Sequence, residues 1–105
     1  MSRWLYHALV AAEDRGDPYA PASLASEGFV HASFATAVHE TIALYLPPDD
    51  SLVIFQIDPR LLGVTIEVVE TPRGPMPHLH GPIPRSAIAQ RYTRTSLPTT
   101  LLDAI

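Results

Sequence analysis

Histidine is the residue type on which catalytic or binding chemistry in this sequence would depend. The chain has five histidines but no cysteine, lysine or asparagine. These absences exclude a thiolate nucleophile, a Cys-ligated zinc, a Schiff-base lysine and a phosphate loop that needs lysine. Imidazole, hydroxyl, carboxylate and guanidinium groups remain, together with backbone amides.

Two of the histidines alternate in the string His78-Leu79-His80-Gly81. Side chains two residues apart lie on the same side of an extended segment, so both imidazoles could face one site. That spacing is compatible with a metal ion if a third histidine joins the pair. Taken alone it is a weak indication of a metal, and the competing interpretation is a turn whose rings bond to backbone carbonyls. A His-ligated metal enzyme therefore stays an alternative, and no metal is favoured.

A third histidine lies in the string Phe29-Val30-His31-Ala32-Ser33, where a strand is expected to lead into a helix. The start of a helix presents unpaired N–H groups and a partial positive charge, which can hold a phosphate without lysine. His31 and Ser33 would share one face of the strand and could act together. Ser33 could instead cap the helix, and no Gly-x-Ser-x-Gly string surrounds it to indicate a serine hydrolase.

Four charged side chains are further candidates for the site. Glu67 and Glu70 fall on opposite faces of an expected strand, and the one facing inward could accept a proton or stabilise a cationic transition state. Arg73 and Arg85 flank the His78 string and could bind a phosphate or a carboxylate. For all four, a solvated surface position is the competing interpretation.

The charge balance and the hydropathy exclude several classes of protein. Seven arginines against eleven acidic residues give a net charge of −4, which lacks the basic footprint of a nucleic-acid-binding protein. No stretch approaches the roughly 20 apolar residues that span a bilayer, and the N-terminus lacks the apolar region of a signal peptide. We therefore expect a cytoplasmic protein without a nucleic-acid or membrane partner.

The elements that must position these side chains are short. Eleven prolines interrupt the chain, because proline lacks a backbone donor and restricts the residue before it. The pattern predicts strands over residues 4–10, 28–33, 51–57, 64–70 and 88–93, and helices over 22–27 and from 34 or 36 to 46. Residues 72–77 are expected to be a stiff loop. Such an irregular order favours a single α+β domain over residues 1–105.

The second predicted helix carries its own expectations. Its buried stripe would consist of Val38, Ile42, Tyr45 and Leu46. A side-chain oxygen of Ser33 or Thr36 could cap its start. The fifth histidine, His39, would occupy an exposed position on this helix.

Several strings occur together in a characteristic order: Tyr6-His7, then Pro21-Ala22-Ser23-Leu24, then Glu27-Gly28-Phe29-Val30-His31-Ala32-Ser33, then Leu52 to Pro59, then Pro77-His78-Leu79-His80-Gly81-Pro82. In this order they resemble the small bacterial proteins of domain-of-unknown-function family nine hundred and fifty-two. The resemblance covers roughly residues 4–94, leaving 95–105 as a C-terminal tail. The sequence departs from the family where His80 replaces a usual tyrosine, and the segment after His7 is short.

The resemblance implies an ADP-ribosyltransferase-like fold, in which two small sheets form a cleft for NAD. His7 would then contact the ribose or pyrophosphate of a nucleotide, and His31 would line the same cleft. Glu67 could occupy the catalytic carboxylate position, in competition with His78 and His80.

These observations together predict a His-lined cleft that binds NAD or a related nucleotide and transfers or hydrolyses its ADP-ribosyl group. Catalytic roles are expected for His31, His78 and Glu67, and ligand-binding roles for His7, Ser33, His80, Gly81 and Arg85. A non-catalytic module that binds a small anion or a protein partner is the alternative. The sequence does not indicate an oligomeric state.

Overall fold

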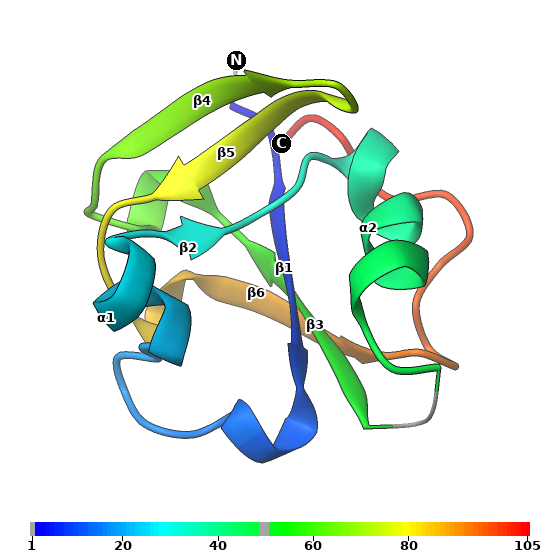
Figure 1. Cartoon of the computed structure of the whole chain (residues 1–105), viewed down its shortest axis with the longest axis horizontal. Helices are drawn as coiled ribbons and strands as arrows, with labels where there is room; N and C mark the ends of the chain where they lie inside the picture. Colours follow the sequence, from blue (N-terminus) through cyan, green and yellow to red (C-terminus); the bar gives the residue numbers. More distant parts are fainter. Residues whose placement is uncertain (1, 49–50) are drawn as a thin grey trace.

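Two antiparallel sheets of three strands each organise the chain, as the computed structural model shows for residues 2–48 and 51–105 (Figure 1). The first sheet has the order β1-β3-β6, with β1 at Leu5–Val10, β3 at Leu52–Ile57 and β6 at Ile88–Thr93. The second has the order β2-β5-β4, with β2 at Val30–His31, β5 at Gly74–Leu79 and β4 at Ile66–Thr71. The helices are α1 (Ala22–Glu27) and α2 (Val38–Tyr45). Short 3₁₀ turns lie at Ala11–Glu13, Ala35–Ala37, Pro59–Leu61 and Arg85–Ala87. The α+β prediction with two small sheets is confirmed.

Strand β3 is the centre of the first sheet, and all six of its residues are buried. Each of its two faces packs in a separate cluster of apolar side chains. One face packs with Leu5 and Leu9 of β1 and with Val30 and Leu79 of the second sheet, so this cluster joins the two sheets. The other face packs beneath α2 and the C-terminal tail. Burial on both faces explains why β3 reads as a continuous apolar run.

The two sheets are also connected through their backbones. Tyr6 of β1 and Ser33, which follows β2, exchange two hydrogen bonds: Tyr6 N–H donates to the Ser33 carbonyl at 2.9 Å, and Ser33 N–H donates to the Tyr6 carbonyl at 2.7 Å. This bridge sets β1 beside the end of β2. It therefore places His7 next to the segment that carries His31.

The prediction of a loop over residues 72–77 is wrong, because most of this segment belongs to β5, the central strand of the second sheet. Alternation along an antiparallel strand aims the backbone groups of Pro75 and Pro77 toward β2, as the bond from Ala32 N–H to the Pro77 carbonyl shows. Strand β2 has only two residues, and they pair with His78 and Leu79. Neither residue of β2 is therefore paired with Pro75 or Pro77, so the backbone N–H groups that these prolines lack are not needed by the strand.

The start of α2 also differs from the prediction. A 3₁₀ turn precedes the helix, and no side-chain oxygen among the described residues caps either element, so neither Ser33 nor Thr36 is a cap. Within the predicted apolar stripe, Val38 and Ile42 are buried, but Tyr45 is 66% exposed. By contrast, α1 ends as predicted at Gly28, whose φ of 85° is the left-handed conformation that glycine adopts most readily.

The C-terminal tail folds back beside residues 2–4, which lead into β1 (Figure 1). Trp4 N–H donates to the Asp103 carbonyl at 2.8 Å, and the Tyr6 hydroxyl donates to the Leu102 carbonyl at 2.8 Å. Burial, assisted by the neighbouring Tyr92 and Asp103, raises the pKa of Tyr6 to about 12. None of the described helices is long and apolar enough to cross a membrane.

Gly81 follows β5 in a packed position, which gives a first prediction. A Cβ added at Gly81 would lie 2.6 Å from Cγ1 of Val64. The substitution Gly81→Ala should therefore lower the free energy of unfolding by about 1–3 kcal/mol, the usual cost of overpacking. Urea denaturation of G81A, V64A and the double variant measures this. The double variant should recover part of the loss, and an unchanged stability of G81A would contradict the packing role.

Candidate functional site

A cavity of about 900 Å³ lies against β1 and the β2–β5 side of the second sheet, and it also reaches α1 and α2. Of the eight residues that were given catalytic or ligand-binding roles from the sequence, four line it: His7, His31, Ser33 and His78. The other four do not: Glu67, His80, Gly81 and Arg85. The structure thus brings together half of the predicted site and separates the other half from it. The further candidate Arg73 lines the cavity as well, whereas Glu70 does not.

His7 is buried in the wall of this cavity, and both of its ring nitrogens are bonded. Nδ1 lies 2.6 Å from the His31 carbonyl oxygen, and Nε2 lies 2.9 Å from the Tyr19 hydroxyl oxygen. A carbonyl only accepts, so Nδ1 must carry the hydrogen and Nε2 accepts the Tyr19 hydrogen. Burial lowers the pKa of His7 to about 4 despite that backbone bond, so the ring is neutral near pH 7. Contact with a ribose, as the resemblance implies, would have to replace one of these bonds.

His31 and His78 face each other across β2 and β5 at the cavity. Their ring centroids are 5.5 Å apart at a steep angle of 76°. His31 Nε2 lies 2.9 Å from Glu27 Oε2 of α1, and the His78 ring stacks on Phe29 at 4.0 Å. Burial, and then the nearby His31, lower the pKa of His78. Two imidazoles in different surroundings therefore share one wall of the cavity.

Another part of the cavity carries hydroxyls and a guanidinium. Ser33 Oγ lies 3.3 Å from Thr41 Oγ1, which accepts a hydrogen bond from Arg73 Nη1 at 3.2 Å. The Arg73 guanidinium also lies over the Tyr45 ring, 4.9 Å from its centroid. The ion pair from Arg73 to Glu40 is longer, at 3.6 Å. We call Arg73, Thr41 and Ser33 the anion end of the cavity, because their groups suit a phosphate or carboxylate.

Glu67 and His80 form a pair outside the cavity. His80 Nε2 lies 2.9 Å from Glu67 Oε1, and both side chains are exposed to solvent. The alternation of His78 and His80 does not bring both rings to the cavity, because β5 ends at Leu79. Nor do residues 2–48 and 51–105 contain a group of three His, Asp or Glu side chains placed to hold a metal ion.

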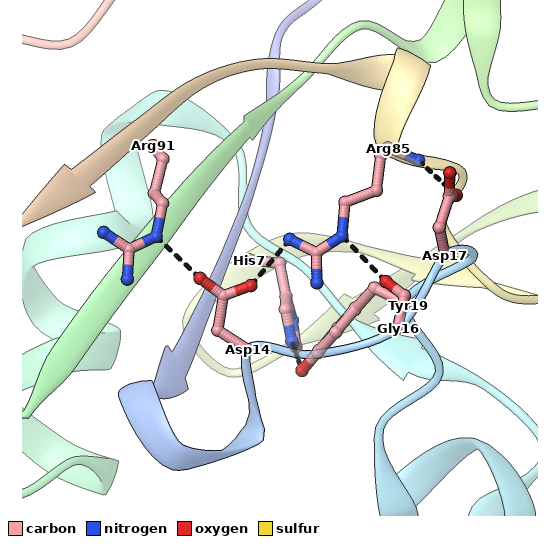
Figure 2. Close-up of polar contacts among 7 residues, drawn as sticks. All are labelled: His7, Asp14, Gly16, Asp17, Tyr19, Arg85 and Arg91. Carbon is pink, nitrogen blue, oxygen red and sulfur yellow. Dashed lines mark hydrogen bonds and ion pairs between the residues drawn. The ribbon is translucent and has the colours of Figure 1, made fainter.

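Arg85 lies outside the cavity lining, where it holds the loop after β1 in place (Figure 2). Its Nη1 donates to Asp14 Oδ1 at 2.6 Å, and its Nε donates to the Gly16 carbonyl at 2.8 Å. Arg91 of β6 donates to the other oxygen of Asp14, also at 2.6 Å. Burial alone would raise the pKa of Asp14, but the hydrogen bonds from Arg91 and Arg85 outweigh it and lower the pKa.

This arginine clamp, formed by Asp14, Arg85 and Arg91, also orients Tyr19. The Arg85 guanidinium lies 6.0 Å from the centroid of the Tyr19 ring and 5.4 Å from that of Phe55. Burial raises the pKa of Tyr19, so its hydroxyl keeps the hydrogen that it donates to His7. The clamp, Tyr19 and His7 thus form a continuous set of contacts from β6 to the cavity wall (Figure 2).

Sequence reasoning missed Asp14, Tyr19, Thr41 and Tyr45. Asp14 and Tyr19 sit in a loop without periodicity, and their partners Arg85 and His7 are distant in the sequence. Thr41 and Tyr45 carry a detectable signal, since residues four apart share one face of a helix. That spacing could have placed both beside Arg73 had the strand β5 been recognised.

Comparisons with known proteins concern the fold and the family. A family model described as "Protein of unknown function (DUF952)" matches residues 6–91. The crystal structure of CC0527 from Caulobacter crescentus superposes with a TM-score of 0.75 at 21% identity, covering 95% of this chain and 92% of that one. The solution NMR structure of CC0527 gives a TM-score of 0.67 at 23% identity, with 91% of each chain covered. None of the functionally curated proteins matches the sequence. The ADP-ribosyltransferase-like fold stays a prediction.

His7 predicts how stability depends on pH. The depressed pKa of its folded state means that the unfolded chain, with a pKa near 6.5, binds a proton first. The contribution of His7 to the free energy of unfolding should therefore be fully present above pH 6.5. It should fall by up to about 3 kcal/mol as the pH drops to 4. His78 contributes in the same direction. The hydrogen bonds from Arg60 likewise lower the pKa of the Asp58 carboxyl, so Asp14 and Asp58 lose their stabilisation only as the pH falls below the ordinary pKa of 3.8. Denaturation between pH 7.5 and 4 measures the slope.

The variant His7→Gln tests whether His7 causes this dependence of the free energy of unfolding on pH. It keeps a side chain that can donate and accept hydrogen bonds but cannot titrate. Its free energy of unfolding should be lower at pH 7.5 and should change much less between pH 6.5 and 4. An undiminished slope in this variant would show that another group carries the pH dependence.

The arginine clamp gives a third prediction. Asp14→Asn removes the charge that two arginines share, and it should lower the free energy of unfolding by about 1–2 kcal/mol, because both guanidinium groups are partly exposed. Asp17→Asn is the matched control, since Asp17 accepts a hydrogen bond from the Arg85 backbone N–H and forms no ion pair within residues 2–48 and 51–105. Urea denaturation of both variants checks this. Equal losses in the two would contradict the clamp.

Proposed function

Since this chain belongs to the DUF952 family of proteins of unknown function, its activity has to be argued from its own site, and we propose that the cavity binds a nucleotide. The observation that carries this proposal is the convergence on one cavity of the anion end and the facing imidazoles of His31 and His78. Its volume of about 900 Å³ falls within the range of pockets that hold small organic ligands.

The lining favours a ligand with one anionic group and an extensive apolar or aromatic surface. Most of the wall is apolar, with Val10, Leu46, Pro72 and Met76 among its residues. Arg73 supplies the guanidinium of the described lining, and its hydrogen bond to Thr41 directs it within this region. A phosphate could displace the longer contact to Glu40, since its oxygens match the donors of arginine.

NAD and ADP-ribose are the nucleotides that we propose as first ligands. If NAD reacts here, transfer or hydrolysis of the ADP-ribosyl group would release nicotinamide and develop positive charge on the ribose. A carboxylate near that carbon would stabilise it. Glu13 lines the cavity whereas Glu67 does not, so Glu13 takes the role first considered for Glu67. A non-catalytic module that binds a small anion remains the second candidate, favoured by the engagement of both His7 nitrogens.

Titration with NAD, ADP-ribose, AMP and inorganic phosphate tests the proposal. A ligand that binds only the folded state raises the melting temperature, and calorimetry then gives its Kd. We expect a shift with at least one nucleotide, and about a tenfold or greater rise of its Kd in Arg73→Gln, which loses a charged hydrogen-bond donor.

Arg15→Gln is the matched control for Arg73→Gln. Arg15 is exposed and lies outside the cavity lining, so the variant changes the net charge equally without touching the cavity. Its Kd should stay at the parent value. No shift with any nucleotide at millimolar concentration would overturn the proposal. A shift with phosphate but not with nucleotides would support the small-anion-binding module. Binding of NAD without release of nicotinamide would support nucleotide binding and contradict the ADP-ribosyl reaction.

A further inference from the structure

We propose that His31 and His78 form an acid–base pair that hydrolyses a phosphodiester bond in the bound nucleotide. This inference rests on the proposed nucleotide binding and adds a reaction to it. It differs from ADP-ribosyl chemistry because the bond that breaks is between phosphorus and a ribose oxygen. The two imidazoles, rather than a carboxylate, would then do the chemistry.

The geometry holds both rings in place before any ligand arrives. His31 of β2 and His78 of β5 are directly paired across the strands, with ring centroids 5.5 Å apart. Phe29 supports both, since it stacks on His78 at 4.0 Å and meets the His31 ring edge-on at 4.7 Å. Catalytic groups held in this way need little reorganisation during the reaction. The pair lines the cavity wall, so a bound ligand can reach both rings.

The surroundings of the two rings assign their roles. Glu27 Oε2 accepts a hydrogen bond from His31 Nε2, so His31 is the ring paired with a carboxylate, which stabilises an imidazolium beside it. We therefore assign His31 the role of the acid, with Nδ1 as the nitrogen that donates. His78 lies against the Phe29 ring instead, and burial lowers its pKa, with a further lowering by His31 and His80 and an opposing effect of Glu67 and Glu27. His78 is therefore the neutral base.

The reaction balances with water as the only co-reactant. The water oxygen bonds to phosphorus while the bond from phosphorus to the ribose oxygen breaks, and the electron pair of that bond stays on the ribose oxygen. His78 takes a proton from the water, and His31 donates one to the departing oxygen. Proton exchange with solvent then restores both rings. The product is a phosphate monoester that keeps every atom of the nucleotide and of the water.

The chemistry of the cavity favours a diester over other phosphate compounds. A ribose alkoxide is a poor leaving group and must receive a proton as it departs, which is the task of an imidazole acid. A diester also carries a single negative charge, and Arg73 is the guanidinium that the described lining offers to it. A 2′,3′-cyclic nucleotide has this single charge, and it holds the phosphodiester and the ribose leaving oxygen in one small molecule.

Hydrolysis of 2′,3′-cyclic AMP by the full chain, followed by chromatography, tests the pair. We expect turnover with a bell-shaped dependence on pH, since one ring must be neutral and the other protonated. His31→Gln and His78→Gln should each reduce the rate by about 100-fold or more. His39→Gln is the matched control, because His39 lies on α2, outside the cavity, and contacts the Pro98 carbonyl.

The variant Glu27→Gln distinguishes a chemical role of the acid–base pair from a purely structural one. The amide keeps a hydrogen-bond partner for His31 but removes the negative charge beside it, so the rate should fall and its dependence on pH should change, while the melting temperature stays near that of the parent. A loss of rate with an unchanged pH profile would contradict the assigned roles.

The two proposals fail in different ways. Binding of 2′,3′-cyclic AMP by calorimetry without any hydrolysis would overturn the acid–base pair and leave nucleotide binding standing. Absence of binding by this nucleotide, by NAD and by ADP-ribose would overturn both. Hydrolysis that persists in both His31→Gln and His78→Gln would overturn the assignment to this pair.

Discussion

One buried imidazole holds the two halves of this structure in register. His7 of β1 donates to the His31 carbonyl of β2 and accepts from the Tyr19 hydroxyl, so a single neutral ring links the first sheet, the second sheet and the loop after β1. The backbone bridge between Tyr6 and Ser33 beside it needs the same separation of the sheets. Because a buried polar group without partners is costly, moving the two sheets apart would destabilise the fold by leaving this ring without its hydrogen bonds. The shape of the cavity wall follows from it.

The remaining contacts divide the cavity into two chemically different regions. At the anion end, Arg73, Thr41 and Ser33 combine residues from the β4–β5 turn, from α2 and from the end of β2. At the other, His31 and His78 face each other and are supported by Phe29 and Glu27. The arginine clamp fixes the loop that carries Tyr19, and Tyr19 in turn bonds to His7 in the cavity wall. A relative such as CC0527, at 21% identity, shares the fold, so these side chains of the present chain carry the functional argument.

Local sequence patterns predicted the parts of the fold that depend on local physics. The continuous apolar run of β3 and the glycine that ends α1 are visible in the sequence, and both elements were placed correctly. Strand β5 was missed because its prolines are acceptable only when β2 is two residues long, which no pattern within residues 72–77 reveals. In the candidate site, too, the sequence indicated the residues that lie in local strings but not the contacts between distant residues. His31, Ser33 and His78 lie within strings that also form the cavity wall, whereas the hydrogen bond from Arg85 to Asp14, 71 residues away, is not visible in any local string.

The imidazole rings themselves report most directly on whether the cavity is a ligand site built around His7. A long-range ¹H–¹⁵N NMR spectrum of the histidine side chains, with and without ADP-ribose, distinguishes the five rings and the tautomer of each neutral one. We expect His7 to keep its hydrogen on Nδ1 with and without the ligand. We also expect the resonances of His31 and His78 to move with the ligand while those of His39 stay in place. A His7 ring protonated on both nitrogens at pH 7, or ligand-induced shifts confined to His39, would contradict these expectations.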